Sequence, residues 1–129
     1  MTSAAHPLPH WLTVSTSPAP AVVDGRVCRT RAAFFEEVAR ALRFPGYFGR
    51  NWDALTDCLR DTGAVALLVE HAEELLDAEP PEQFATLLAV LADAAEGGLT
   101  VTLRTDAAHE AALRQRAAAA LTGRAGAGN

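Results

Sequence analysis

The sequence predicts a small α/β domain in which a three-stranded parallel sheet is packed with helices. The chain of 129 residues is long enough for one modest core. Its hydrophobic patterns follow the order strand, helix, helix, strand, helix, strand, and helices between short apolar strands are typical of parallel crossovers. An alanine-rich stretch after Asp106 predicts one more helix. We therefore expect a partly flexible N-terminal extension (1–20), a central domain (21–105) and a C-terminal helix with a flexible tail (106–129).

The N-terminal extension is rich in Pro, Ser, Ala and Thr. Its one apolar island, residues 11–14, is either an additional edge strand or part of a tail. Residues 21–23 then predict a short strand. Asp24 and Gly25 indicate a turn, and residues 26–28 are expected to continue the strand beyond it.

The first helix is expected to begin after Thr30, which is a favourable N-cap residue, and to run to about Arg43. Phe34 and Val38 share one face at the spacing of an amphipathic helix, so this face predicts the contact with the core. Pro45 ends the helix, because proline disfavours helical backbone in the residue before it.

The middle of the chain predicts a second helix followed by a buried strand. Asn51 is the expected cap of this helix, which runs to Leu59 or a few residues further. Residues 64–69 form a near-continuous apolar run, which is typical of a strand buried on both faces.

A third helix, a last strand and the C-terminal helix complete the prediction. Residues 80–82, Pro-Pro-Glu, are a strong helix start, and a pair of glycines at 97–98 ends this helix. Residues 99–103 alternate as a strand. The C-terminal helix is expected to end near Leu121, and residues 123–129 are expected to form a tail. On that helix Glu110 and Arg114 have the i,i+4 spacing of an ion pair.

Composition and charge exclude several classes of function. The net charge is −5 and no basic stripe is visible, which disfavours a nucleic-acid binder. No stretch is apolar enough to cross a bilayer, and no secretory signal precedes the domain. Cys28 and Cys58 are too few for a disulfide scaffold or a four-ligand zinc site. The four histidines lack metal-ligand spacing and receive no role. We expect a cytoplasmic protein without cofactor or metal.

The second helix carries the most informative pattern in the chain. Asp53, Asp57 and Asp61 follow one another at four-residue steps, roughly opposite an apolar stripe. Like charges at this spacing destabilise a helix slightly, and Arg60 is placed to neutralise Asp57 in part. Charge runs are usually solvated faces. The alternative is an external cationic partner, and spacing alone leaves both interpretations open.

A resemblance favours the second interpretation. Residues 44–59 read Phe-Pro-Gly-Tyr-Phe-Gly-Arg-Asn-Trp-Asp-Ala-Leu-Thr-Asp-Cys-Leu. This run resembles the signature of the barstar family, the intracellular inhibitors of barnase-type ribonucleases. The matching positions are Pro, Tyr, Gly, Asn, Asp, Ala, Leu, Asp, Cys and Leu. The similarity extends from about residue 23 to Glu70, and from the helix around Phe84 to the strand 99–103.

The resemblance implies a barstar-like fold and a ribonuclease-binding surface on the loop and the second helix. It implies that Asp57 occupies the phosphate pocket of a guanyl-specific ribonuclease, and that the complex contains one copy of each protein. The predicted ribonuclease-binding residues are Asp57, Asp53, Tyr47, Gly49, Asn51, Thr56, Asp61 and Asp93. Asp93 enters through an alignment counted back from Gly98.

The sequence also departs from the family. Thr56 and Thr62 stand where the family has interface tryptophans, Phe48 lacks a tyrosine hydroxyl, and Arg50 replaces an acid. A disulfide is not implied, because Cys28 has no counterpart in the family. These departures concern the identity of the target more than the mode of binding.

Other interpretations remain. Asp53 and Asp57 could form the acid/base pair of a glycosidase-like enzyme, which would require one buried carboxyl group. The domain could instead be a binding module for a different basic protein or toxin. Tyr47 and Phe48 could both be core aromatics, whereas we expect Trp52 in the core and Cys58 as a small buried side chain rather than a nucleophile.

Overall fold

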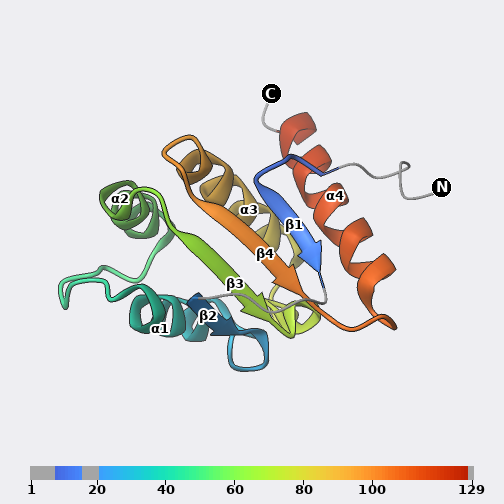
Figure 1. Ribbon diagram of the computed structural model, residues 1–129, viewed down its shortest axis with the longest axis horizontal. Coiled ribbons are helices and arrows are strands. Elements are labelled where there is room, and N and C mark those ends of the chain that lie inside the picture. The colour runs from blue at the N-terminus through green and yellow to red at the C-terminus, as the bar shows by residue number, and fades with distance from the viewer. Residues whose placement is uncertain (1–7, 16–20, 128–129) are drawn as a thin grey trace.

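The computed structural model describes residues 8–15 and 21–127, and its centre is a four-stranded, all-parallel sheet (Figure 1). The strands lie in the order β1-β4-β3-β2. Their bounds are Leu12–Ser15 (β1), Ala21–Asp24 (β2), Ala66–Glu70 (β3) and Thr100–Arg104 (β4). The α-helices are Arg31–Leu42 (α1), Trp52–Thr62 (α2), Pro81–Ala95 (α3) and Glu110–Ala127 (α4).

The expected three-stranded sheet is wrong by one strand, because the apolar island near the N-terminus is β1. It pairs in parallel with β4, with Leu12 opposite Val101 and Val14 opposite Leu103. Leu12 and Val14 are each 3% exposed, so the pairing buries both. The element order is therefore strand, strand, helix, helix, strand, helix, strand, helix. The sequence of a four-residue segment is too short to distinguish a strand from a tail. Residues 12–15 form a strand because the edge of β4 is free to pair with them.

The strand expected to continue through residues 26–28 is replaced by a 3₁₀ turn, η2 (Gly25–Val27). The Asp24 carboxylate accepts the Arg26 backbone N–H at 2.9 Å, which turns the chain. Gly25 is packed against backbone, since a Cβ built there would lie 2.2 Å from the His71 carbonyl oxygen. The turn thus depends on Gly25, because a residue without a side chain lets η2 approach the backbone of residues 70–71 closely.

The caps predicted for α1 and α2 are confirmed. The Thr30 hydroxyl accepts the Ala33 N–H at 3.2 Å, and Arg43 ends α1 in the left-handed region. The Asn51 side chain accepts the Ala54 N–H at 2.7 Å. Each cap satisfies a backbone donor that the first turn leaves free.

The predicted apolar runs form the core. Three consecutive residues of β3, Leu67, Leu68 and Val69, are buried. Helix α3 begins at Pro81 as expected and passes behind β4 in Figure 1. Its apolar stripe is buried throughout: Phe84, Leu87, Leu88 and Leu91. The glycine pair ends α3, and Gly98 has the positive φ of 111° that glycine adopts without strain.

Helix α4 packs on the domain beside β1 (Figure 1). Leu113 and Ala117 are buried, and the Arg116 guanidinium lies 3.9 Å from the Phe84 ring centroid. The predicted Glu110–Arg114 ion pair is confirmed at 3.0 Å. The helix extends to Ala127, so the tail expected from residue 123 onwards is wrong up to that residue. Most of the extension predicted to be flexible, residues 1–7 and 16–20, lies outside the described residues, as do residues 128–129.

Candidate functional site

The loop between α1 and α2 reaches farthest from the sheet on the left of Figure 1. Phe48 anchors it, since its ring lies 5.1 Å from the Phe44 ring and 6.0 Å from that of Phe35. The expectation that Phe48 is a core aromatic is confirmed, because it is 4% exposed. Tyr47 is 85% exposed and is not a core residue. The loop therefore presents a large amphipathic side chain to solvent.

Arg50 ties the same loop to α1. Its guanidinium forms an ion pair with Glu36, and Nη1 donates a hydrogen bond to the Phe48 carbonyl oxygen at 3.1 Å. The hydrogen bond from Arg50 lowers the pKa of the Glu36 carboxyl group. The Arg50 cation is thus bound within the protein.

Helix α2 separates an apolar face from a polar one. Leu55 and Leu59 are buried, whereas Trp52 is only partly buried. The Trp52 ring lies 4.9 Å from the Phe35 ring, and its indole N–H donates to the Gln83 side-chain oxygen at 3.1 Å. The expectation that Trp52 lies in the core is therefore confirmed only in part. Its ring packs against Phe35, but its indole N–H is polar and binds Gln83 near the surface.

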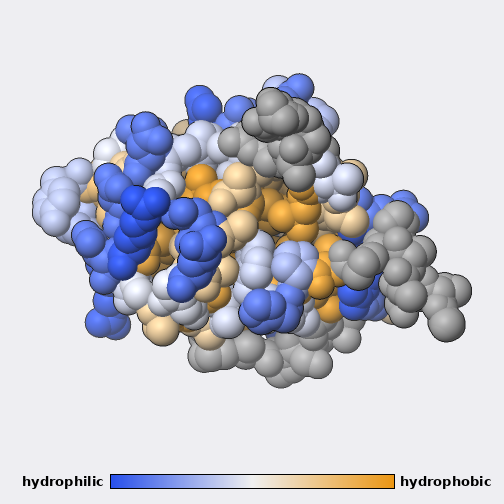
Figure 2. All heavy atoms as spheres, turned by 90° about the horizontal axis from the view of Figure 1, so that it is seen from above, coloured by the Kyte–Doolittle hydropathy of each residue, from blue (hydrophilic) through white to orange (hydrophobic). Residues whose placement is uncertain are grey.

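The acid row (Asp53, Asp57 and Asp61) lies exposed on the other face of α2. Within the described residues none of the three carboxylates has an ion-pair partner. Figure 2 shows hydrophilic side chains gathered at the left end of the molecule, where α2 and the loop before it lie in Figure 1. This part of the surface can attract a cationic partner, because its negative charges are not compensated.

Arg60 does not neutralise Asp57, contrary to expectation. Its Nη2 lies 3.1 Å from Asp93 Oδ2 on α3, and its Nε donates to the same oxygen at 3.3 Å. Asp93 was predicted to contact the ribonuclease, and in the structure it is joined to α2 through Arg60. The spacing along α2 predicts a pair with Asp57, whereas the packing of α2 on α3 brings a different acid to Arg60.

The remaining predicted residues belong to the loop and the same helix. Gly49 and Asn51 are exposed, and the Asn51 amide also donates to the Gly49 carbonyl oxygen at 3.4 Å. Thr56 is partly buried, and its hydroxyl donates to the Trp52 carbonyl oxygen at 3.0 Å. The Thr62 hydroxyl donates likewise to the Cys58 carbonyl oxygen at 2.8 Å. Both threonines thus direct their polar groups to their own helix.

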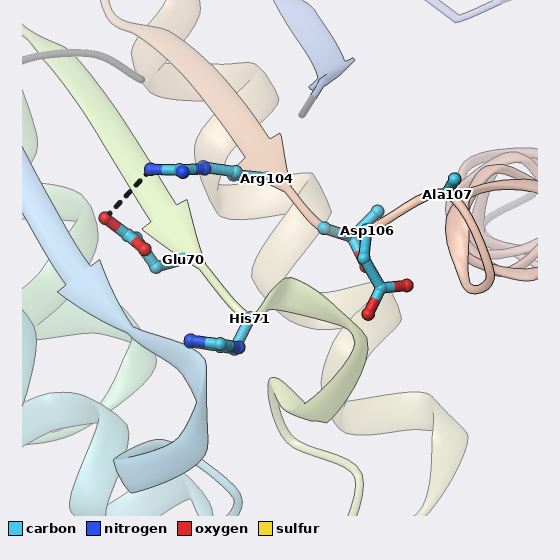
Figure 3. Close-up of a pocket in the computed structure, with 6 residues that line it drawn as sticks. Glu70, His71, Arg104, Asp106 and Ala107 are labelled. Atoms are coloured by element: carbon cyan, nitrogen blue, oxygen red, sulfur yellow. Dashed lines mark hydrogen bonds and ion pairs between the residues drawn. The ribbon is translucent and has the colours of Figure 1, made fainter. Parts of the chain in front are cut away.

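A cavity of about 500 Å³ opens at the carboxyl ends of β3 and β4 (Figure 3). Glu70 and Arg104 at the ends of these strands form an ion pair of 3.2 Å, and Asp106 lines the cavity from the β4–α4 connection. None of the predicted ribonuclease-binding residues lines this cavity. It is separate from the acid row.

One group of potential metal ligands occurs among the described residues, although no role was expected for the histidines. Ligand atoms of Glu73, Asp106 and His109 lie within 4.8 Å of one another. These groups already have partners, since Asp106 accepts the His109 N–H at 3.0 Å and Glu73 accepts the Thr105 hydroxyl at 2.6 Å. The sequence offers no signal for this group, because Glu73 is distant along the chain.

The two cysteines are free thiols. Burial raises the pKa of Cys28 to about 12. Burial, with smaller effects of Asp61 and Asp57, also raises the pKa of Cys58. Cys58 is only partly buried, so the expectation of a buried side chain is wrong for it, and its raised pKa disfavours the nucleophilic thiolate. Over the described residues, no helix has the length and apolar character needed to span a membrane.

Comparison with known proteins identifies a family. The model of the family described as Barstar (barnase inhibitor) matches residues 19–112, well over half of the chain. The match includes the loop, α2 and α3, whereas β1 and most of α4 lie outside it. Among curated proteins, no significant match was found.

Proposed function

The chain belongs to the barstar family, and from this we propose that it inhibits a guanyl-specific, barnase-like ribonuclease by covering the active site. The covering surface consists of α2 and the loop before it. The observation that carries the proposal is the acid row, in which Asp53, Asp57 and Asp61 are exposed without an ion-pair partner among the described residues. Such an inhibitor protects the cell that produces the ribonuclease.

The mechanism is mimicry of RNA phosphates by carboxylates. A ribonuclease that cleaves RNA through a cyclic phosphate holds its phosphate site with cationic side chains. Asp57 enters this site, Asp53 supports it from one turn earlier, and Tyr47 with the Gly49 backbone closes the rim. Charge-assisted hydrogen bonds from arginine to carboxylate are strong where water is excluded. The acid row also accelerates the encounter with a basic enzyme.

The geometry of the loop supports a rigid inhibitory surface. Phe48 is buried, Arg50 is bound to Glu36, and Asn51 caps α2, so the loop is held at successive positions. A surface that is already ordered loses little conformational entropy on binding. We propose a monomer that binds the ribonuclease one to one in the cytoplasm, where the free thiols of Cys28 and Cys58 remain reduced.

The same observations disfavour an enzyme. A glycosidase-like pair requires one carboxyl group in an apolar environment that keeps it protonated. Asp53 and Asp57 are both exposed on α2. The proposal therefore assigns them to binding rather than to catalysis.

Titration against a panel of barnase-like ribonucleases tests the proposal, with RNA cleavage as the readout. We expect stoichiometric inhibition by the wild-type protein. Asp57→Asn should weaken binding about ten- to hundredfold, since a hydrogen bond to a charged group contributes about 1.5–3 kcal/mol. Glu82→Gln, which removes an exposed acid at the start of α3, is the matched control and should inhibit normally. A loss of no more than twofold in Asp57→Asn would contradict the assignment of Asp57.

A second candidate is a binding module for a different basic protein, such as another toxin. The hydroxyls of Thr56 and Thr62 bind their own helix, so the face of α2 offers no aromatic anchor at these positions. Aromatic anchors carry much of the affinity in many interfaces. A folded protein that inhibits no ribonuclease of the panel would favour this candidate, and affinity capture with the Asp57→Asn variant as the negative control would follow.

A further inference from the structure

Resting on the proposed function, we propose that Asp93 is a positioning residue for the inhibitory surface. It holds the Arg60 guanidinium on the α3 side of α2 and so leaves the Asp57 carboxylate free for a cation of the ribonuclease. Asp93 then acts through Arg60, and it does not itself contact the ribonuclease.

The sequence places Arg60 within reach of the acid row. Side chains three residues apart on a helix are neighbours, with about 5–6 Å between their Cβ atoms, so Arg60 and Asp57 can pair. In the structure the guanidinium is bound elsewhere. Nε donates to Asp93 Oδ2 at 3.3 Å and Nη2 donates to Asp93 Oδ1 at 3.4 Å, while Nη2 also lies 3.1 Å from Oδ2. Because two nitrogens engage one carboxylate, the direction of the guanidinium plane is set by α3.

The Arg60–Asp93 ion pair affects the charge of Asp93 and leaves Asp57 without Arg60 as its partner. Arg60 neutralises Asp93, and both oxygens of that carboxylate already accept from it. Asp57 has no ion-pair partner among the described residues. An Arg60 side chain turned towards Asp57 would place a cation beside the site that the ribonuclease cation must occupy. Two like charges about 4 Å apart repel by about 1 kcal/mol even in bulk water.

The Arg60–Asp93 ion pair is exposed, so it can be broken by substitution at a small cost in stability. The Arg60 and Asp93 side chains are 62% and 42% exposed, and such surface pairs contribute at most about 1 kcal/mol. Removal of the Asp93 charge therefore lets Arg60 move to Asp57, three residues before it on the same helix, while the fold is kept.

Ribonuclease affinity of the variants Asp93→Asn, Arg60→Ala and the double variant tests the proposal, with thermal unfolding as a check of the fold. Asp93→Asn should bind about three- to tenfold more weakly, and Arg60→Ala should bind as well as the wild type or up to about threefold more tightly. The double variant should return to within about twofold of the wild type.

Two other roles of Asp93 predict different results. If the ion pair only stabilises the fold, Arg60→Ala and Asp93→Asn break the same pair and should weaken binding equally. If Asp93 touches the ribonuclease directly, the double variant should stay as weak as Asp93→Asn. Either result overturns the proposal.

A matched control separates local pairing from net charge. Glu96→Gln removes one exposed negative charge from the end of α3, and among the described residues the ion-pair partner of Arg60 is Asp93 and not Glu96. Measurements at 0.5 M salt suppress long-range attraction, since the screening length there is below 10 Å. We expect Glu96→Gln to bind within about twofold of the wild type under these conditions, and a loss as large as that of Asp93→Asn would contradict the proposal.

A measurement on the free protein distinguishes failure of this inference from failure of the proposed function. The ¹³C chemical shift of the Asp57 carboxyl carbon should change in Asp93→Asn and return in the double variant. An unchanged shift would overturn the sequestration of Arg60 even if the protein inhibits ribonucleases. A changed shift in a protein that inhibits none would leave sequestration standing and reject the proposed function.

Discussion

Tyr47 and Phe48 are adjacent in the chain and point in opposite directions. Tyr47 is 85% exposed, whereas Phe48 is 4% exposed and lies against Phe35 and Phe44. One aromatic side chain thus anchors the loop before α2, and its neighbour is available to a partner.

This arrangement predicts opposite effects of two alanine substitutions. Phe48→Ala should lower the free energy of unfolding by about 3–5 kcal/mol, because it leaves a cavity in the core. Tyr47→Ala should change it by less than about 0.5 kcal/mol and should weaken ribonuclease binding. Urea denaturation and inhibition assays measure the two effects. A similar loss of stability in both variants would contradict the described loop.

Arg50 predicts an unusual order among its variants. Its φ of 54° lies in the left-handed region, which costs non-glycine residues about 1–2 kcal/mol. Arg50→Gly and Arg50→Ala both lose the ion pair with Glu36, but only the glycine variant relieves the backbone. We expect Arg50→Gly to be more stable than Arg50→Ala by about 1 kcal/mol in chemical denaturation. Equal stability would argue against the left-handed conformation.

Gly25 and Gly46 predict a contrast between two glycine-to-alanine substitutions. A Cβ at Gly25 would meet the His71 carbonyl oxygen at 2.2 Å, whereas nothing lies within 4 Å of one at Gly46. Gly25→Ala should destabilise the protein by about 1–3 kcal/mol or more, because backbone must move. Gly46→Ala is the matched control, and thermal unfolding compares them. A tolerated Gly25→Ala would show that η2 and the β3 end are not in close contact.

Strand β1 predicts that the N-terminal segment contributes to the core. Leu12→Ala should cost about 2–5 kcal/mol, since Leu12 is buried where β1 pairs with β4. Thr13→Ala, at the exposed position next to it, should be nearly neutral. Urea denaturation of both variants tests the pairing. Equal effects of the two substitutions would mean that β1 is not part of the sheet.

His109 and Asp106 predict a pH dependence of stability. Their side chains lie 2.7 Å apart, which raises the pKa of His109 and lowers that of Asp106. The His109 contribution is complete below its unfolded pKa and is lost as the pH rises through its folded pKa. The Asp106 contribution is present above its unfolded pKa and is lost as the pH falls through its folded pKa.

The pair therefore stabilises the fold most at mildly acidic pH. The difference in unfolding free energy between the wild type and His109→Gln should be largest at about pH 5, between the ordinary pKa values of the two groups, and should shrink above neutrality. Denaturation at a series of pH values measures it. The Asp106 bond to the His109 backbone N–H remains in both proteins. A difference that grows with pH would contradict the assignment.

Elements whose causes are local can be predicted from the amino-acid sequence. Thr30 and Asn51 cap their helices because their side-chain oxygens reach backbone donors within the same turn. The acid row and the apolar stripe of α2 follow from helical periodicity alone. These features depend on neighbours a few residues away, and the structure confirms them.

Contacts between groups distant in the chain depend on how the elements pack. The tertiary structure paired Arg60 with Asp93 instead of Asp57, and Arg50 with Glu36. It also made the apolar island near the N-terminus a fourth strand, because β4 offers an open edge. The partner of a long charged side chain depends on how two helices pack, and the pairing of a short strand depends on which sheet edge is free. Neither is encoded in local spacing, so the charges left free on α2 became visible only in the folded protein.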